Sequence, residues 1–516
     1  MPTRCLIKPS EYHDSITLME TARELTQLPG ILDSAVVMAT EANLSILREA
    51  GLLVHELTEA TANDLVVVVR AESDAAADRA LQTAEEHLAR RPRATGTGTA
   101  FRPRTIRGAV RGNPGANLAI ISVAGQYAGG EAWEALHGGL HVLLFSDNVP
   151  LEDEIALKRY ASERGLLMMG ADCGTAIING VALGFANVLP RGPVGIVAAA
   201  GTGLQEVSTL LSKMGLGVTQ GIGTGGRDMK EQVGGIAMLQ GIHALQADPA
   251  TEVLLLVSKP PAPAVVDRVL AQVRRSDKPT VVCFLGGDPA PIVSAGAIPA
   301  RTLREAAYLA AAQVSGSSAL ESIEQDTNNL RSQADELRGL LGPGQKYLRG
   351  LFSGGTLAAE ALVIWQDGIL GDVYSNVPLG PHLKLKDATR SQGHCVIDLG
   401  EDEFTVGRPH PMIDNDLRIR RLLQEAADPE VALILLDVVL GYGVHPNPAG
   451  ELGPAIRDAR QSALAAGREL LVIASVTGTE EDPQRLSRQV QALEEAGAIV
   501  APCNAAAARL AGSIVA

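Results

Sequence analysis

The sequence predicts a multi-domain α/β protein, and three observations support this fold class. Its 516 residues are enough for roughly three to five domains. The composition is 46% hydrophobic but only 3% aromatic, with 54 glycines. Such a composition is typical of Ala-, Val- and Leu-rich helices on parallel strands rather than of a β-sandwich. The same glycine–threonine turn between an apolar strand and a helix occurs twice, which indicates a duplicated unit.

The charge and the cysteines restrict the class of protein further. A formal net charge of −15 argues against a nucleic-acid partner, because the phosphates would be repelled. The five cysteines are odd in number, far apart and without metal-ligand spacing, so we expect reduced thiols and no metal site. No apolar run reaches the ~18 residues of a membrane span. We therefore expect a cytoplasmic protein that has no membrane partner.

Residues 1–92 are expected to form a small N-terminal α/β domain. The apolar run Leu65–Val69 predicts a fully buried parallel strand, and Ser73 is placed to cap the Ala-rich helix Asp74–Arg90. The other elements expected here are strands Leu6–Lys8 and Asp33–Met38 and helix Ser15–Leu28. Residues 93–114 are basic and rich in Pro and Gly, so we interpret them as a linker. The less favoured alternative is that their arginines steer an anionic ligand.

Residues 115–191 are expected to form a Rossmann-like domain. A buried strand at Asn117–Val123 leads into a glycine-containing turn and a helix that ends at His137. The elements that follow are strand His141–Phe145, helix Glu152–Arg164 and strand Leu166–Met169. The glycine spacing departs from G-x-G-x-x-G, so a nicotinamide cofactor is not expected.

Residues 192–316 and 346–516 are expected to be two flavodoxin-like domains that repeat one pattern of strands and helices. Gly407-Arg408 corresponds to Gly226-Arg227 in this repeat, and Asp428-Pro429 before an apolar strand corresponds to Asp248-Pro249. Residues 317–345 between the copies are polar and are predicted to be a helical connector.

The two glycine–threonine turns are the main candidates for a ligand site. They are Gly201, Thr202 and Gly203 in the first copy and Gly354, Gly355 and Thr356 in the second. Glycine lets backbone N–H groups approach a ligand closely, and the first turn of a helix leaves donors unpaired at its positive end. Such a turn suits an anion. One turn alone would be weak evidence, but two in corresponding places predict a phosphate or acyl phosphate held between facing helix ends.

Several motifs resemble the succinyl-CoA synthetase superfamily. The resemblance to its α-subunit rests on Met169–Thr175, Gly195–Thr202, Gly221–Gly226 and Ser294–Ile298. Further blocks along the whole chain, such as Gly354–Glu360 and Val406–Asp414, resemble the FdrA family within that superfamily. The resemblance implies a Rossmann-like CoA-binding-type domain, two flavodoxin-like succinyl-CoA-synthetase-type domains and a small N-terminal α/β domain.

Departures from the synthetase pattern bear on the activity. The synthetase carries its phosphoryl group on a histidine, where this chain has Ser294. Where the synthetase has a glutamate that orients this histidine, this chain has Lys259. Nothing in the sequence resembles an ATP-grasp domain or a Walker A motif. A nucleotide-driven relay is therefore not expected, whereas the pair of helix ends that would hold phosphate is retained.

The FdrA resemblance implies a subunit of an oxamate carbamoyltransferase-type complex in purine (allantoin) breakdown. Such a complex converts oxalurate and phosphate to oxamate and carbamoyl phosphate, and its partners would be other subunits of a hetero-oligomer and a small anionic substrate. An acyl-CoA synthetase subunit with its nucleotide site on a partner is the first alternative. A non-catalytic metabolite-binding scaffold is the second. The leading hypothesis requires no cofactor, with phosphate or carbamoyl phosphate as substrate or product, and leaves CoA binding open.

Four residues are candidates for catalysis. Lys259, Arg227 and Arg408 lie at predicted strand ends or loops, where the carboxyl edges of parallel sheets gather ligands. An arginine there could clamp the oxalurate carboxylate bidentately, and the alternative for each is an ordinary ion pair. His410 lies between two prolines and could act as a general acid or, as the less favoured alternative, as a displaced phosphoryl carrier. A histidine tied into a loop hydrogen bond is the commoner outcome.

The turns at which the synthetases place coenzyme A form a separate candidate site. They contain Gly125, Gln126, Tyr127, Ser146 and Asn148. Because carbamoyl transfer does not need CoA, three interpretations stay open: a working CoA site, an inherited scaffold, and an interface for partner subunits.

Overall fold

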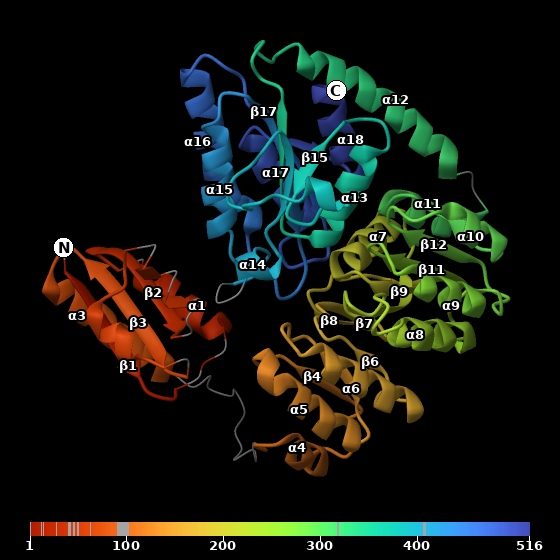
Figure 1. Ribbon diagram of the computed structural model, residues 1–516, viewed down its shortest axis with the longest axis horizontal. Coiled ribbons are helices and arrows are strands. Elements are labelled where there is room, and N and C mark those ends of the chain that lie inside the picture. Colours follow the sequence, from red (N-terminus) through yellow and green to blue (C-terminus); the bar gives the residue numbers. More distant parts are fainter. Residues whose placement is uncertain are drawn as a thin grey trace. The chain divides into compact units, whose positions relative to one another are not determined.

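The chain forms two compact units in the computed structural model (Figure 1). One consists of Met1–Phe101 with Glu401–His410, and the other of Arg102–Gly400 with Pro411–Ala516. The structure describes residues 2–11, 13, 15–26, 28–39, 43–44, 47–48, 51–61, 63–89, 103–316, 319–405 and 409–516. In these described residues, no helix combines the length and the apolar run that a membrane crossing needs.

The first unit contains a three-stranded sheet in the order β1-β3-β2. Its elements are β1 (Thr3–Lys8), α1 (Ser15–Thr26), β2 (Ile31–Met38), η1 (His55–Glu59), β3 (Leu65–Ala71), α3 (Asp74–Ala89) and α14 (Asp402–Thr405). The central strand β3 is buried as predicted, but the prediction of a parallel strand was wrong because β3 pairs antiparallel with both neighbours. An apolar run reports burial on both faces and carries no information on strand direction. The predicted cap is confirmed, since the Ser73 hydroxyl accepts the Ala76 N–H at 3.3 Å.

The second unit begins with a small parallel sheet in the order β4-β5-β6, formed by β4 (Leu118–Ile121), β5 (His141–Leu144) and β6 (Met168–Met169). Its helices are α4 (Ile106–Gly112), α5 (Gly125–His137) and α6 (Leu151–Glu163). Helix α4 lies within residues 93–114, the segment interpreted as a linker. Thr105 caps it by accepting the Gly108 N–H at 3.0 Å, and Ile106 and Val110 pack against the core of this sheet. The second half of that segment is thus part of the Rossmann-like domain.

The first flavodoxin-like copy is built on a seven-stranded sheet in the order β13-β12-β11-β9-β10-β7-β8. Its strands are β7 (Thr175–Ile178), β8 (Val181–Gly184), β9 (Arg191–Ala199), β10 (Val218–Gly223), β11 (Val253–Ser258), β12 (Thr280–Phe284) and β13 (Ile298–Pro299). Its helices are α7 (Gly201–Lys213), α8 (Ile236–Ala247), α9 (Pro263–Val273), α10 (Pro289–Ser294) and α11 (Leu303–Ser315). The hairpin β7–β8 pairs with β10 and so extends this sheet, although the sequence placed residues 171–191 with the preceding domain. Asn179 and Gly180, with φ of 52° and 79°, form its two-residue turn.

The second copy has a six-stranded parallel sheet in the order β15-β16-β14-β17-β18-β19. Its strands are β14 (Tyr347–Phe352), β15 (Val373–Ser375), β16 (His394–Asp398), β17 (Val431–Val439), β18 (Leu471–Thr477) and β19 (Ile499–Ala501). Its helices are α13 (Gly355–Gln366), η2 (Pro381–Leu383), α15 (Asp416–Ala426), α16 (Pro448–Ala465), α17 (Leu486–Glu495) and α18 (Asn504–Val515), and α12 (Ala319–Arg338) is the predicted connector. The run β19-β18-β17-β14-β16 repeats the run β13-β12-β11-β9-β10 of the first copy. The predicted multi-domain α/β fold class is confirmed.

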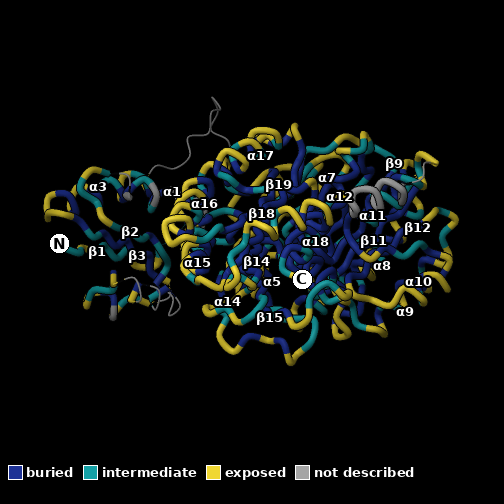
Figure 2. The backbone as a smooth tube through the Cα atoms, turned by 90° about the horizontal axis from the view of Figure 1, so that it is seen from above, coloured by how far each residue is buried: buried dark blue, intermediate teal, exposed yellow. Residues whose placement is uncertain are grey.

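The two copies share one hydrophobic core. A single cluster of buried side chains contains strand residues of both sheets together with residues of α7, α13 and α18, and Figure 2 shows the tube around β11 and α18 as largely buried. Trp365 of α13 is fully buried there and donates its indole N–H to the Ala508 carbonyl at 2.6 Å. The two copies therefore form one packed body.

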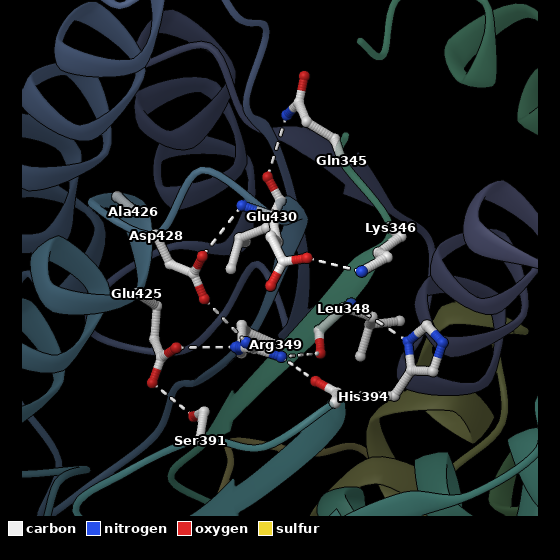
Figure 3. A network of polar contacts seen from close by, with 12 residues as sticks. Gln345, Lys346, Leu348, Arg349, Ser391, His394, Glu425, Ala426, Asp428 and Glu430 are labelled. Carbon is white, nitrogen blue, oxygen red and sulfur yellow. Dashed lines mark hydrogen bonds and ion pairs between the residues drawn. The ribbon is translucent and has the colours of Figure 1, made fainter. Parts of the chain in front are cut away.

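The amino end of β14 is anchored by a polar network (Figure 3). Arg349 is 3% exposed, and its guanidinium lies 2.8 Å from the Glu425 carboxylate and 3.2 Å from that of Asp428. Ser391 donates to the second oxygen of Glu425 at 2.6 Å. A buried cation between two carboxylates satisfies the charges that would otherwise be costly at this depth. The network fixes β14, whose opposite end leads into the second glycine–threonine turn.

Candidate functional site

The two glycine–threonine turns lie against each other. They start α7 and α13, and each threonine packs on a glycine of the opposite turn. A Cβ atom added to Gly354 would lie 2.9 Å from Thr202 Cγ2, and one added to Gly203 would lie 2.9 Å from Thr356 Cγ2. Both distances are too short for real side chains, so only glycine permits this approach. We call these six residues, Gly201–Gly203 and Gly354–Thr356, the paired turns.

The paired turns present unpaired donors. In the described part of the chain, no acceptor takes the N–H groups of Gly201, Thr202 and Gly203 at the start of α7, nor those of Gly355 and Thr356 at the start of α13. The hydroxyls of Thr202 and Thr356 likewise have no hydrogen-bond partner among the described residues. Two positive helix ends with unpaired donors, packed together, form a place that can hold an oxyanion.

One predicted donor of the paired turns is already used within the protein. The Gly354 N–H goes to the Asp437 carboxylate at 2.8 Å, and the Ser353 N–H goes to the other oxygen at 2.7 Å. Asp437 is fully buried on β17, and Arg418 of α15 donates to it at 3.1 Å. The arginine offsets the negative charge of this carboxylate at the helix start. Burial lowers the pKa of the Arg418 guanidinium, while Asp437 opposes this effect.

Lys259 extends from the end of β11 to the second turn. A Cβ atom added to Gly355 would lie 2.7 Å from Lys259 Nζ and 2.3 Å from Asp398 Oδ2, and the lysine and aspartate are 4.0 Å apart. The predicted lysine is therefore brought to the paired turns. Asp398, which lies at the carboxyl end of β16, was missed by the sequence reasoning. The available signal was a lone acid that ends an otherwise apolar strand, Cys395–Asp398.

The glutamates four residues after each threonine cap helices of the opposite copy. Glu206 of α7 accepts the Asn504 N–H at the start of α18, at 3.0 Å. Glu360 of α13 accepts the Leu303 N–H at the start of α11, at 2.6 Å. Both side chains are buried and close together, so burial and then the charge of Glu206 raise the pKa of Glu360 to about 8. This reciprocal capping holds the paired turns in register.

Adding one methyl group to Gly203 should disturb the contact between the turns. Its Cβ would meet Thr356 Cγ2 at 2.9 Å and Val257 Cγ1 at 3.0 Å. We expect Gly203→Ala to lower the free energy of unfolding by about 1–3 kcal/mol, since overpacking outweighs the gain in helix propensity. Urea unfolding measures the change. Gly130→Ala, in α5 with no atom within 4 Å of the added Cβ, is the matched control and should be neutral or stabilising. Equal stability of the two variants would contradict the close contact.

Arg227 does not extend to the paired turns. Its guanidinium lies 2.8 Å from the buried Glu154 carboxylate and donates to the Val149 carbonyl at 2.8 Å. Glu154 also contacts Lys158, which donates to Asp228 at 2.7 Å, and all three of these side chains are fully buried. Arg227 therefore forms the ion pair that the sequence left open as the alternative to a catalytic role. Its partner, Glu154, comes from α6 of the Rossmann-like domain. The network attaches that domain to the glycine-rich loop 221–228.

The remaining catalytic candidates stay predictions. Arg408 and Gly407 lie outside the described residues. His410 is half-buried and groups with the first compact unit. Cys173 is buried, and burial raises the pKa of its thiol to about 12, which disfavours a thiolate at neutral pH.

The residues of the CoA-type site come together at the carboxyl ends of β4 and β5. A Cβ atom added to Gly125 would lie 2.2 Å from the Asp147 carbonyl oxygen, and Ser146 accepts the Val123 N–H at 3.0 Å. Both are thus used in joining the two turns, whereas Gln126, Tyr127 and Asn148 are exposed. Exposed acids at the same edge include Asp147, Glu152, Asp153 and Asp172, the last of which donates its backbone N–H to the Ser146 carbonyl. These carboxylates would repel the phosphates of CoA, whereas Arg227, whose side chain is 35% exposed and contacts Val149 and Glu154, supplies a cation at the same edge.

Comparisons with known proteins agree with this architecture. The CoA-ligase family model matches residues 351–514, and the model "AllF, heavy metal-associated domain" matches residues 1–103. The uncharacterized protein YahF of Escherichia coli (strain K12) is 47% identical over 501 residues, which cover 97% of this chain and 96% of YahF. The succinate–CoA ligase α-subunit of Methanothermobacter thermautotrophicus is 26% identical over 38% of this chain and 70% of its own length.

Two further matches are more distant. The sulfoacetate-CoA ligase subunit SauD of Bilophila wadsworthia is 25% identical over 36% of this chain and 64% of its own length. A solved acetyl-coenzyme A synthetase of Ca. Korarchaeum cryptofilum, in complex with phosphate and ADP, gives a TM-score of 0.34 at 15% identity, over 77% of this chain and 82% of its own.

The residues of the N-terminal domain do not fit a heavy metal. Cys5 is the one cysteine in residues 1–103, and it lies half-buried in β1. Soft metals require several thiolate or imidazole ligands, and no group of three or more His, Cys, Asp or Glu in the described residues could hold an ion. Two comparisons establish the family of the chain: the match to YahF over nearly the whole length of both chains, and the match of the second copy to the CoA-ligase model. The chain belongs to the family of YahF, which is built on the scaffold of the succinyl-CoA synthetase superfamily.

Proposed function

We propose that this chain is a phosphate-binding subunit of a carbamoyl-transfer enzyme, which converts oxalurate and phosphate to oxamate and carbamoyl phosphate. The observation that carries the proposal is the packing of two helix starts with unpaired N–H and hydroxyl groups, with Lys259 beside them. The match of residues 1–103 to an AllF-type domain supports a link to allantoin breakdown.

The paired turns would hold phosphate as the nucleophile. One phosphate oxygen forms a bond to the carbamoyl carbon of oxalurate, and the bond from that carbon to the oxamate nitrogen breaks, with a proton moving to the nitrogen. Backbone donors hold the phosphate charge without a proton transfer, and they retain their geometry throughout the reaction. Lys259 would stabilise the negative charge that develops on the carbamoyl oxygen, while Asp398 holds the lysine in place.

The chain departs from a nucleotide-driven ligase at two positions. Ser294 is the last residue of α10, and in the resemblance to the synthetases it corresponds to the histidine that carries the phosphoryl group. Serine lacks the imidazole nitrogen on which a phosphohistidine forms. Lys259 replaces the acidic residue that would orient such a histidine. Direct use of bound phosphate needs neither group, and this favours transfer to phosphate over a phosphoenzyme relay.

Removing the two threonine hydroxyls should weaken phosphate binding. In the double variant Thr202→Val and Thr356→Val, the methyl contacts with Gly354 and Gly203 remain while both hydroxyl donors are lost. We expect phosphate affinity to fall at least tenfold, about 1.4 kcal/mol, as measured by calorimetry on the full chain. The double variant with serine at both positions keeps the hydroxyls and should bind phosphate nearly as well as the natural chain. Unchanged affinity in the valine variant would rule out the site.

A subunit of an acid–thiol ligase is the second candidate, and the CoA-ligase match of residues 351–514 favours it. Calorimetry with CoA separates the two, since micromolar CoA binding would favour the ligase and phosphate or carbamoyl phosphate binding without CoA would favour carbamoyl transfer. Binding of none of these, together with tight association with another chain, would favour a non-catalytic scaffold.

The proposal includes partner chains that complete the active site. Its test is purification of the complex from the native host with an assay for carbamoyl phosphate that depends on oxalurate. A complex that holds this chain but forms no carbamoyl phosphate from oxalurate and phosphate would overturn the proposal.

A further inference from the structure

A pocket of about 830 Å³ lies at the carboxyl edge of the first sheet, apart from the paired turns. It is lined by Pro260, Phe284 and Pro299 at the ends of β11, β12 and β13, and by residues of α11, α12, α13 and α18. The carboxyl edge of a parallel sheet is where open α/β folds bind ligands. Val363 in its wall lies eight residues beyond Gly355, hence about 12 Å along α13. None of the six residues of the paired turns lines it.

Two of the arginines that line this pocket form no hydrogen bond or ion pair with the described residues. Arg301 pairs with Asp367 at 3.5 Å, and Glu305 accepts the Arg301 backbone N–H at 2.9 Å. Arg509 of α18 is half-buried and Arg331 of α12 is exposed, and neither has a hydrogen-bond or ion-pair partner in the described part of the chain. A guanidinium offers a planar fork of donors that matches a carboxylate. Arg509 acts on the buried Glu360 carboxylate and lowers its pKa, but no hydrogen bond or ion pair joins the two among the described residues, so the guanidinium donors stay open to the carboxylate of a ligand.

The other walls of the pocket distinguish an organic anion from an inorganic one. Phe284, Ile292, Leu330, Val363, Ile364 and Leu379 line it. Phosphate would fill a small part of this volume and leave the apolar walls uncovered, whereas pockets of this size ordinarily take a small organic molecule. A carbon skeleton beside these walls would be removed from water, which adds to the affinity with each methylene.

We propose that this pocket binds an organic carboxylate, with its carboxylate on Arg509 and Arg331 and its carbon skeleton along the apolar wall. The inference does not rest on the proposed function, because the pocket and the paired turns are separate sites with separate residues. A ligand that contacts α13 at its carboxyl-terminal half and α11 at its start touches both copies at once. Such a ligand would favour the packed arrangement of the two copies over a separated one.

Calorimetry on the full chain tests this with hexanoate, acetate, hexanamide and inorganic phosphate as probes. Hexanoate should bind one-to-one and at least tenfold more tightly than acetate, because four more carbons meet the apolar wall. Hexanamide, which has the same skeleton without the charge, should bind at least tenfold more weakly than hexanoate. Absence of hexanoate binding would overturn the proposal. So would displacement of hexanoate by phosphate at equal concentration, since that outcome would show a general anion site.

Variants test whether Arg509 binds the carboxylate and whether the pocket binds it independently of the paired turns. Arg509→Gln should weaken hexanoate binding at least tenfold, Arg509→Lys should weaken it less, and Arg488→Gln on the exposed face of α17 should leave it unchanged. The double variant Thr202→Val and Thr356→Val should bind hexanoate as the natural chain does, even though it loses phosphate. If Arg509→Gln does not fold, Arg509→Lys and Arg331→Gln decide, and natural affinity in both would overturn the assignment. Hexanoate binding that survives Arg509→Gln would overturn it equally.

Discussion

Replacing Arg418 by methionine should lower the free energy of unfolding of the second copy by about 3 kcal/mol or more, because breaking a buried ion pair leaves an uncompensated charge. Asp437 is fully buried and Arg418 is 2% exposed, so water cannot replace the lost guanidinium. Asp437 would keep only the Ser353 and Gly354 donors. The start of α13 would then carry an unbalanced negative charge, and phosphate affinity should fall as well.

Tryptophan fluorescence during urea unfolding measures this change. The chain has two tryptophans, and in a Trp133→Phe background Trp365 reports on the second copy alone. Arg420→Met is the matched control, since Arg420 lies on the same helix, is 65% exposed and pairs with Asp416, so its loss should cost less than about 1 kcal/mol. Adding Asp437→Asn to Arg418→Met should recover part of the loss. If Arg418→Met and Arg420→Met lowered the free energy of unfolding equally, the buried pair would contribute no more to stability than the exposed one.

The stability of the natural chain should fall as the pH rises from about 5 to 8. The folded-state pKa of Glu360 is about 8, well above the unfolded value near 4.5. Between these values the folded state binds more protons than the unfolded state, so stability decreases with rising pH and levels off above about 8. One pKa unit corresponds to about 1.4 kcal/mol, and we expect a decrease of at least this size. Glu206 and Arg509 are the charged groups that act on Glu360, the first raising its pKa and the second lowering it.

Glu360→Gln should flatten this dependence. The amide oxygen can still accept the Leu303 N–H, so the cap of α11 is kept while the titrating group is removed. Urea midpoints between pH 5 and pH 9 compare the natural chain with this variant and with Glu494→Gln on the exposed side of α17. The control should retain the natural pH dependence. A natural chain whose stability rises over this range would contradict the shared burial of the two glutamates.

The sequence predicted the repeated copies and the paired turns because their signals are local. The glycine–threonine–glutamate spacing lies within seven residues in each copy, and the apolar strands stand between turn residues. Lys259 was found because it occupies a strand end that parallel topology brings to the ligand edge. Two local signals went unused. Asn179-Gly180 between apolar runs indicates a hairpin, and Thr105 before Ile106 and Val110 indicates a capped amphipathic helix.

The features that the sequence did not reveal depend on long-range contacts. The partner of Arg227 is Glu154, and that of Asp437 is Arg418; no spacing rule links the members of either pair. The antiparallel direction of β3 likewise depends on how the chain returns between strands, which its apolar residues do not encode. Asp398 looks like an ordinary strand end until the fold places it beside Gly355.

The exchange of helix caps makes each copy depend on the other. Glu206 completes a helix of the second copy, and Glu360 completes one of the first. A free half of this molecule would expose a carboxylate without its backbone donor and a helix start without its acceptor. Joining both halves in one polypeptide keeps the cap partners at a one-to-one ratio, so the pairing of the two copies does not depend on the concentration of a separate chain.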